Sequence, residues 1–218
     1  MASRLETVST VVMALCAVVV TGWLLVARPP LGRAPAPASS VPTAVPDWKI
    51  LATDGNRVGP RGVEPDLVVF TDYQCPWCRV LEERLDTLRS KHVSDLVVVY
   101  RHLPILQLHP FAREAALSVE CAAEQDRFVE MHSELFAAQD SVGVLAWASF
   151  AKRSGVPDVS RFESCLEDPD VLNRIVRDEA EGKKLGIRGT PVVIAGGFLH
   201  RGALAQPQLD SVVLAGRR

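Results

Sequence analysis

The stretch Cys75-Pro76-Trp77-Cys78 constrains this chain more than any other feature. It follows the apolar run 67–70 and opens a segment whose leucines and valines recur at helical spacing. At a helix start, exposed N–H groups and the positive end of the helix dipole stabilise a thiolate. The second cysteine, one turn further on, can close a disulfide with the first. The pattern predicts a redox pair in which Cys75 is the exposed nucleophile and Cys78 the resolving thiol.

Two other interpretations of the pair are a structural disulfide and half of a zinc site. Zinc would need two further ligands, and the sequence has neither a second Cys-x-x-Cys nor a His-x-x-x-His. We therefore expect no metal, and dithiol chemistry needs no bound cofactor.

The first part of the chain has the length and composition of a membrane segment. Residues 7–27 carry no charge, and a helix of that length reaches roughly 30 Å, the thickness of a bilayer core. We predict that residues 1–28 form an uncleaved signal-anchor, a single transmembrane helix, with residues 29–46 as a Pro/Ala-rich linker. A cleaved secretory signal is the alternative, with Ala36-Pro37-Ala38 as its cleavage site.

Two opposing signals bear on which side of the membrane the domain after the span lies. Arg28 and Arg33 after the span outnumber Arg4 before it, which favours a cytoplasmic C-terminus. Of the five cysteines only Cys16 lies in the apolar segment, and the remaining even number is typical of an oxidising compartment. We expect a single-pass protein of the cell membrane with its catalytic domain on the extracytoplasmic side. The net charge of −2, with both signs interspersed, indicates no nucleic-acid partner.

The remaining residues divide by pattern into three parts. Residues 47–105 read as β-β-α-β, with strands expected at Asp47–Ala52, Leu67–Phe70 and Leu96–Tyr100. Residues 106–185 are almost wholly helical in pattern. Strand signals return in residues 186–218, at Val192–Ala195 after Gly189-Thr190-Pro191, and a short helix closes the chain. This organisation predicts an α/β fold interrupted by an inserted helical domain.

Cys121 and Cys165 lie on different expected helices of the insert, and neither has a neighbouring cysteine. We predict that they form a structural disulfide; two buried free thiols are the alternative. For so long a loop, the chain-entropy contribution to stability is about 4 kcal/mol.

Four stretches resemble the DsbA-like thiol:disulfide oxidoreductases of the thioredoxin superfamily, in their membrane-anchored Gram-positive and actinobacterial form. The stretches are Phe70–Cys78, Tyr100–Pro104, Arg127–Phe136 and Leu185–Pro191. The resemblance implies a thioredoxin-like fold in which a cis Pro191 packs beside the cysteines. It also implies that the backbone of Thr190 contacts an extended substrate.

The chain departs from the family pattern at two positions. Thioredoxins and several DsbA proteins have a buried acid six residues before the first cysteine, where this chain has Val69, so another group or water must move the proton. Asp72 is nearer, but an anion beside the site would oppose thiolate formation. Trp77 replaces a histidine between the cysteines, which indicates a milder oxidant, and with Pro76 it is expected to face substrates.

The resemblance implies an extracytoplasmic oxidase that converts thiols of exported proteins to disulfides. Its implied partners are unfolded thiol substrates and a membrane redox protein of the DsbB or VKOR type, and we expect a monomer. A disulfide reductase is one alternative. A Cu(I)-binding or delivery module is another, using Cys75, Cys78 and a histidine such as His102, since soft thiolates suit Cu(I). We expect most of the five histidines to be surface or capping groups, with His109 at a helix entry and His102 nearest the site.

Overall fold

The computed structural model describes residues 41–217. The expected membrane anchor at residues 1–28 lies outside the described residues, as does most of the expected linker. Within residues 41–217, no helix has both the length and the apolar character needed to cross a membrane.

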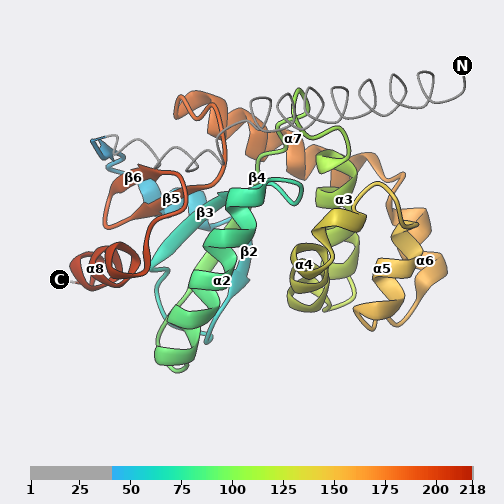
Figure 1. The fold of residues 1–218 in the computed structure, drawn as a ribbon, viewed down its shortest axis with the longest axis horizontal. Helices are drawn as coiled ribbons and strands as arrows, with labels where there is room; N and C mark the ends of the chain where they lie inside the picture. Colours follow the sequence, from blue (N-terminus) through green and yellow to red (C-terminus); the bar gives the residue numbers. More distant parts are fainter. Residues whose placement is uncertain (1–40, 218) are drawn as a thin grey trace, which may run out of the picture. The chain divides into compact units, whose positions relative to one another are not determined.

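A six-stranded mixed sheet forms the centre of the described structure (Figure 1), in the order β1-β6-β5-β3-β4-β2. Only β3 and β4 run parallel, and the other neighbouring pairs are antiparallel. The strands are β1 (Thr43–Ala44), β2 (Asn56–Val58), β3 (Leu67–Thr71), β4 (Val98–His102), β5 (Val192–Ala195) and β6 (Phe198–Arg201). Every residue of β3, β4 and β5 is buried, which explains why they appear in the sequence as largely unbroken apolar runs.

The two faces of the sheet are covered by different helices. Leu67 and Val69 of β3 pack in one apolar cluster with leucines of α2 (Pro76–Lys91) and α8 (Gln206–Gly216). Val68 and Phe70 point the other way and pack in a second cluster with the short helix η1 (Trp48–Ala52). This division follows the alternation of side chains along a strand.

The strand predicted at Asp47–Ala52 is wrong. These residues form the 3₁₀ helix η1, and the strand of this region is β2, which pairs with β4. Trp48 and Leu51 are three residues apart, so one turn of a 3₁₀ helix places both buried side chains on one face. β1 lies within the stretch assigned to the linker and pairs with β6.

The expected helical insertion between the two parts of the sheet is confirmed. It lies between β4 and β5 in the sequence and comprises α3 (Ala112–Ala123), α4 (Phe128–Ala137), η2 (Gln139–Ser141), α5 (Trp147–Arg153), α6 (Val159–Cys165) and α7 (Pro169–Lys184). Its apolar cluster also contains Tyr73, Cys75 and Cys78, so the cysteines lie where the insert meets the sheet. Cys121 of α3 and Cys165 of α6 form a disulfide.

Candidate active site

The two cysteines of the Cys-x-x-Cys stretch lie at the first turn of α2. Cys75 is the N-cap residue with an extended backbone, and Pro76 occupies the first turn, where a missing N–H costs nothing. The carbonyl of Cys75 accepts the backbone N–H groups of Cys78 at 3.0 Å and Arg79 at 3.3 Å. Both thiols are free in this structure.

The segment before β5 brings a second part of the chain to the same place. The Thr190–Pro191 peptide bond is cis. The Sγ of Cys75 donates a hydrogen bond to the carbonyl oxygen of Thr190 at 3.3 Å, although the two residues are 115 positions apart. The structure thus places Thr190 against Cys75, the nucleophile expected from the sequence. Pro191 follows Thr190 through the cis bond.

The environments of the two sulfurs push their pKa values apart. A hydrogen bond from the Cys78 thiol, opposed by burial and aided by Thr190 and by backbone N–H groups, lowers the pKa of Cys75 to about 6. Burial, followed by the interaction with Cys75, raises the pKa of Cys78 well above its ordinary value. Near neutral pH, Cys75 therefore carries the thiolate and Cys78 holds the proton.

The expectation of an exposed sulfur on Cys75 needs correction. The whole residue is only 5% exposed, and Cys78 is 2% exposed. Burial is greater than the sequence indicates because the segment carrying Thr190, far away in the chain, lies against Cys75. The exposed residues are Pro76 and Trp77, the latter 42% exposed, so a substrate meets this face first.

Asp72, which was expected to oppose the thiolate, makes its side-chain polar contacts with groups other than the cysteines. Its buried carboxylate accepts the backbone N–H of Gln74 at 2.8 Å and of Ile105 at 2.9 Å, and it lies 2.8 Å from Nδ1 of His109. His109 therefore holds this carboxylate instead of only opening a helix. Sequence reasoning missed the pairing because it joins segments 37 residues apart.

His102, expected near the site, and His132, expected with most histidines at the surface, are both buried. Nε2 of His102 lies 2.8 Å from a carboxylate oxygen of Glu120, so His102 is already paired with a residue of α3. Nδ1 of His132 lies 2.9 Å from the hydroxyl of Tyr73, which belongs to the same apolar cluster as both cysteines. The sequence singled out His102, whereas the structure connects His132 to the residues beside the site.

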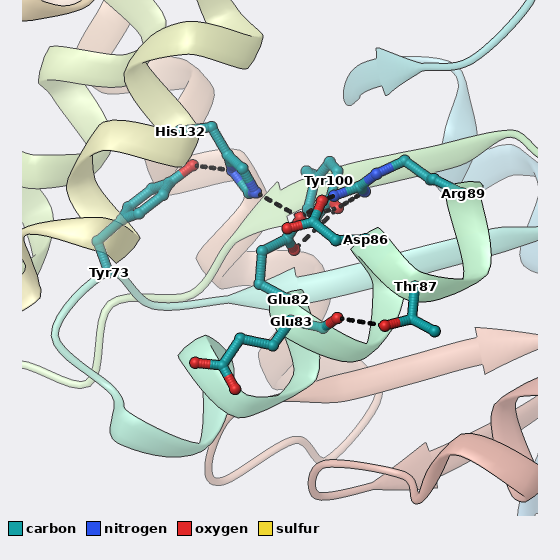
Figure 2. A network of polar contacts seen from close by, with 8 residues as sticks. All are labelled: Tyr73, Glu82, Glu83, Asp86, Thr87, Arg89, Tyr100 and His132. Atoms are coloured by element: carbon teal, nitrogen blue, oxygen red, sulfur yellow. Dashed lines mark hydrogen bonds and ion pairs between the residues drawn. The ribbon is translucent and has the colours of Figure 1, made fainter. Parts of the chain in front are cut away.

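Glu82 is the acidic residue that sequence reasoning did not find (Figure 2). It lies four positions after Cys78 on α2, is buried, and accepts the Tyr100 hydroxyl at 2.9 Å. Burial opposes ionisation, but the contacts with His132 and with the charged Arg89 lower the pKa of Glu82 to about 2. A lone glutamate among the apolar positions of the helix was the only available signal.

Within residues 41–217, no group of three or more histidine, cysteine or acidic side chains is placed to hold a metal ion.

Comparison with known proteins gives two kinds of match. A family model described as thioredoxin matches residues 55–214. Two curated relatives are the Na(+)/H(+) antiporter NhaA 3 of Salinispora tropica and NhaA 1 of Mycolicibacterium vanbaalenii. The first is 33% identical over 157 residues, which are 72% of this chain and 24% of that protein. The second is 31% identical over 173 residues, 72% of this chain and 28% of that protein. The chain thus spans about a quarter of the length of these relatives.

Solved structures resemble the chain over most of its length. A thioredoxin-like oxidoreductase from Silicibacter pomeroyi has a TM-score of 0.67 at 26% identity, covering 80% of this chain and 98% of that one. The catalytic domain of Proteus mirabilis ScsC has a TM-score of 0.61 at 26% identity, covering 74% and 88%. The thiol-disulfide exchange protein alpha-DsbA2 from Wolbachia pipientis has a TM-score of 0.65 at 21% identity, covering 76% and 89%, and shows the fold alone.

Proposed function

This chain belongs to the thioredoxin family, among its DsbA-like thiol:disulfide oxidoreductases, and from that premise we propose that it oxidises thiols of exported proteins to disulfides. The observation that carries the proposal is the difference between the two sulfurs. Cys75, at the helix N-cap and against Thr190, is the stabilised thiolate, while Cys78 remains protonated.

The reaction uses the Cys75–Cys78 disulfide as the oxidant. A substrate thiolate attacks Sγ of Cys75, a substrate–Cys75 disulfide forms, and the electron pair of the broken bond goes to Cys78, which takes up a proton. A second substrate thiolate then attacks the substrate sulfur of this mixed disulfide. The substrate leaves oxidised and Cys75 leaves as a thiolate, whose low pKa makes it a good leaving group.

The surroundings of the sulfurs support a protein substrate. Trp77 presents a half-exposed apolar ring beside the cysteines, which suits an unfolded chain better than a small polar thiol. An extended substrate segment can pair with the backbone of Thr190, which places its cysteine against Cys75.

The cellular setting is part of the same proposal. Residues 1–28 anchor the protein in the cell membrane, and residues 41–217 act on the extracytoplasmic side as a monomer. The reduced pair passes its electrons to a membrane redox protein of the DsbB or VKOR type, which regenerates the disulfide.

An oxidase assay tests the proposal directly. The oxidised protein is mixed with reduced, unfolded ribonuclease, and recovery of ribonuclease activity is followed. We expect recovery with the wild type and none with Cys75→Ser. A matched Ser90→Ala variant, at the far end of α2, should behave as the wild type.

A measurement of the Cys75/Cys78 reduction potential separates the two directions of electron flow. We expect a value between that of thioredoxin, about −270 mV, and that of DsbA, about −120 mV. A value at or below that of thioredoxin, with no ribonuclease recovery, would favour a disulfide reductase. Stoichiometric Cu(I) binding without oxidase activity would favour the copper module.

A further inference from the structure

Cys78 needs a partner for its proton, and the position used elsewhere in the family is occupied by Val69. The chemistry proposed above requires that Cys78 gain a proton when the disulfide opens and lose it when the disulfide closes. Cys78 is 2% exposed, so bulk water does not reach the sulfur directly. A chain of polar side chains begins in the same buried cluster.

That chain runs from Tyr73 through His132 to Glu82 (Figure 2). The Tyr73 hydroxyl lies 2.9 Å from Nδ1 of His132. Nε2 of His132 lies 3.2 Å from Oε1 of Glu82. The 3.2 Å contact at Nε2 has the distance of an ion pair and not the geometry of a hydrogen bond. An imidazole that bears its proton on Nε2 accepts the Tyr73 O–H at Nδ1.

Tyr73, the inner end of the chain, shares a buried apolar cluster with the cysteines, and the transfer between Cys78 and Tyr73 is the step that we infer. Tyr73 is fully buried and packs in the same cluster of side chains as Cys75 and Cys78. Glu82 lies one helical turn beyond Cys78, so α2 carries both on neighbouring positions of one face. The sulfur and the carboxylate are thus held by one rigid element.

The outer end of the chain reaches a surface cavity. Glu82 lines a hollow of about 470 Å³ together with Arg79, Glu83, Asp86 and Ser133. Phe136, whose ring packs against those of Tyr73 and His132, also lines it. Protons can therefore exchange between the buried carboxylate and solvent at this cavity.

We propose, on the basis of the proposed function, that Tyr73, His132 and Glu82 form the proton relay of Cys78, in place of the acid absent at Val69. As Cys78 attacks the substrate–Cys75 disulfide, its S–H proton passes to the Tyr73 oxygen while the Tyr73 proton passes to Nδ1 of His132. The Cys75–Cys78 bond forms, the substrate leaves as a thiolate, and the proton rests on His132 beside Glu82. In the oxidase direction the same steps run in reverse.

The charges around the relay suit this transfer. Glu82 remains ionised over the working pH range, held by Arg89 as well as His132, and it accepts the Tyr100 hydroxyl. An imidazolium formed on His132 is therefore compensated at once. On the other side of Tyr73 lie the ring of His102, on β4, and the charge of Glu120, on α3. The charge of Cys75 also acts on the sulfur of Cys78.

A two-phase thiol reaction isolates the step that uses the relay. The reduced protein is mixed with excess aromatic disulfide reagent whose thiolate is coloured when released. Attack by Cys75 releases one coloured thiolate, and attack by Cys78 on the mixed disulfide releases a second. In Tyr73→Phe and His132→Gln we expect the second phase to slow by about 10²-fold at neutral pH and to recover as pH rises. The first phase should be unchanged.

Ser118→Ala is the control, because it removes a buried hydroxyl that donates to the carbonyl oxygen of Ala115 and touches no member of the relay. Its second phase should equal that of the wild type. If Tyr73→Phe does not fold, His132→Gln and Glu82→Gln carry the test.

Three outcomes overturn the relay or the function beneath it. Wild-type second phases at all pH values in the folded relay variants would overturn the relay, as would equal slowing in Ser118→Ala. The absence of a second phase from the wild type itself would instead contradict the dithiol function.

Discussion

The low pKa of Cys75 comes from hydrogen bonds to its sulfur and not from a neighbouring cation. Cys78, Thr190 and backbone N–H groups of α2 stabilise its thiolate, and the residue between the cysteines that could have carried charge is the neutral Trp77. The resulting pKa of about 6 lies between the values of about 7 for thioredoxin and about 3.5 for DsbA. A pKa in this range predicts an oxidant milder than DsbA, and this expectation, also drawn from Trp77, stays a prediction until the potential is measured.

Variants at Thr190 and Cys78 should rank these contributions. We expect Thr190→Val, which removes the hydroxyl but keeps the carbonyl that Cys75 contacts, to raise the pKa of Cys75, and Cys78→Ala to raise it further, because the Cys78 thiol makes the larger contribution. A single lost hydrogen bond to a charged group corresponds to about one pKa unit or slightly more. Thiolate absorbance in the ultraviolet, followed against pH, measures both shifts. Thr87→Val, on the exposed side of α2, is the control, and a reversed ranking would contradict this account.

At the scale of elements, α7 is held to the sheet by a buried ion pair. The carboxylate of Asp178 accepts Nε–H of Arg101 on β4 at 2.5 Å and the backbone N–H of His102 at 2.7 Å. Arg101 also donates to the carbonyl oxygen of Leu51 at 2.7 Å, so one guanidinium connects η1, β4 and α7. The connection joins the insert to two elements of the first part of the sheet domain.

Removing the Asp178 carboxylate should therefore be costly. We expect Asp178→Ala to lower the free energy of unfolding by about 3–5 kcal/mol, because Arg101 is left charged and buried. The adjacent Glu179 pairs with Arg113 at 2.9 Å but is partly exposed, so Glu179→Ala should cost below about 1 kcal/mol. Urea unfolding of both variants makes the comparison, and equal losses would refute it.

The disulfide between α3 and α6 is a second constraint at this scale. Its cysteines are 44 positions apart, and the chain-entropy account gives about 4 kcal/mol for a loop of that length. In a background of Cys75→Ala/Cys78→Ala, replacing Cys121 and Cys165 by alanine should lower the free energy of unfolding by about this amount. Denaturant unfolding without reductant measures the change. A loss below about 1 kcal/mol would show that packing alone holds the insert.

At the scale of the whole molecule, the redox state of the active site and the stability of the fold are coupled. The pKa of Cys75 is lower in the folded protein than in an unfolded chain, so ionisation of this thiol stabilises the folded, reduced form. The contribution is complete above the ordinary thiol pKa of about 8.5 and is lost as pH falls through about 6. The oxidised form has no such thiol.

The difference in stability between the reduced and oxidised forms should therefore depend on pH. Between about pH 6 and pH 8.5, the free energy of unfolding of the reduced form should rise relative to that of the oxidised form. Paired denaturant titrations across this range measure it. Cys75→Ala cannot form the active-site disulfide. Its free energy of unfolding, measured with and without reductant over the same pH range, gives the pH dependence that comes from all other groups. A difference that stays flat or falls with pH would contradict the pKa assigned to Cys75.

Local patterns in the sequence determined much of this protein. Cys75 and Cys78 at a helix start, the buried runs of β3 and β5 and the helical block between them all follow from periodicity and helix-end chemistry, which act over a few residues. The short strand and 3₁₀ helix near the start of the sheet were misplaced, because partners distant in sequence decide them.

Only the tertiary structure decided which polar groups meet. The pairs Asp72–His109, His102–Glu120 and Tyr73–His132 join segments 18 to 59 positions apart, and no spacing rule relates their members. Burial then sets their consequences, because a charge removed from water is stabilised only by the partner that the fold supplies. The local sequence thus identifies the reactive sulfurs, whereas the groups that exchange protons with them depend on how the insert packs against the sheet.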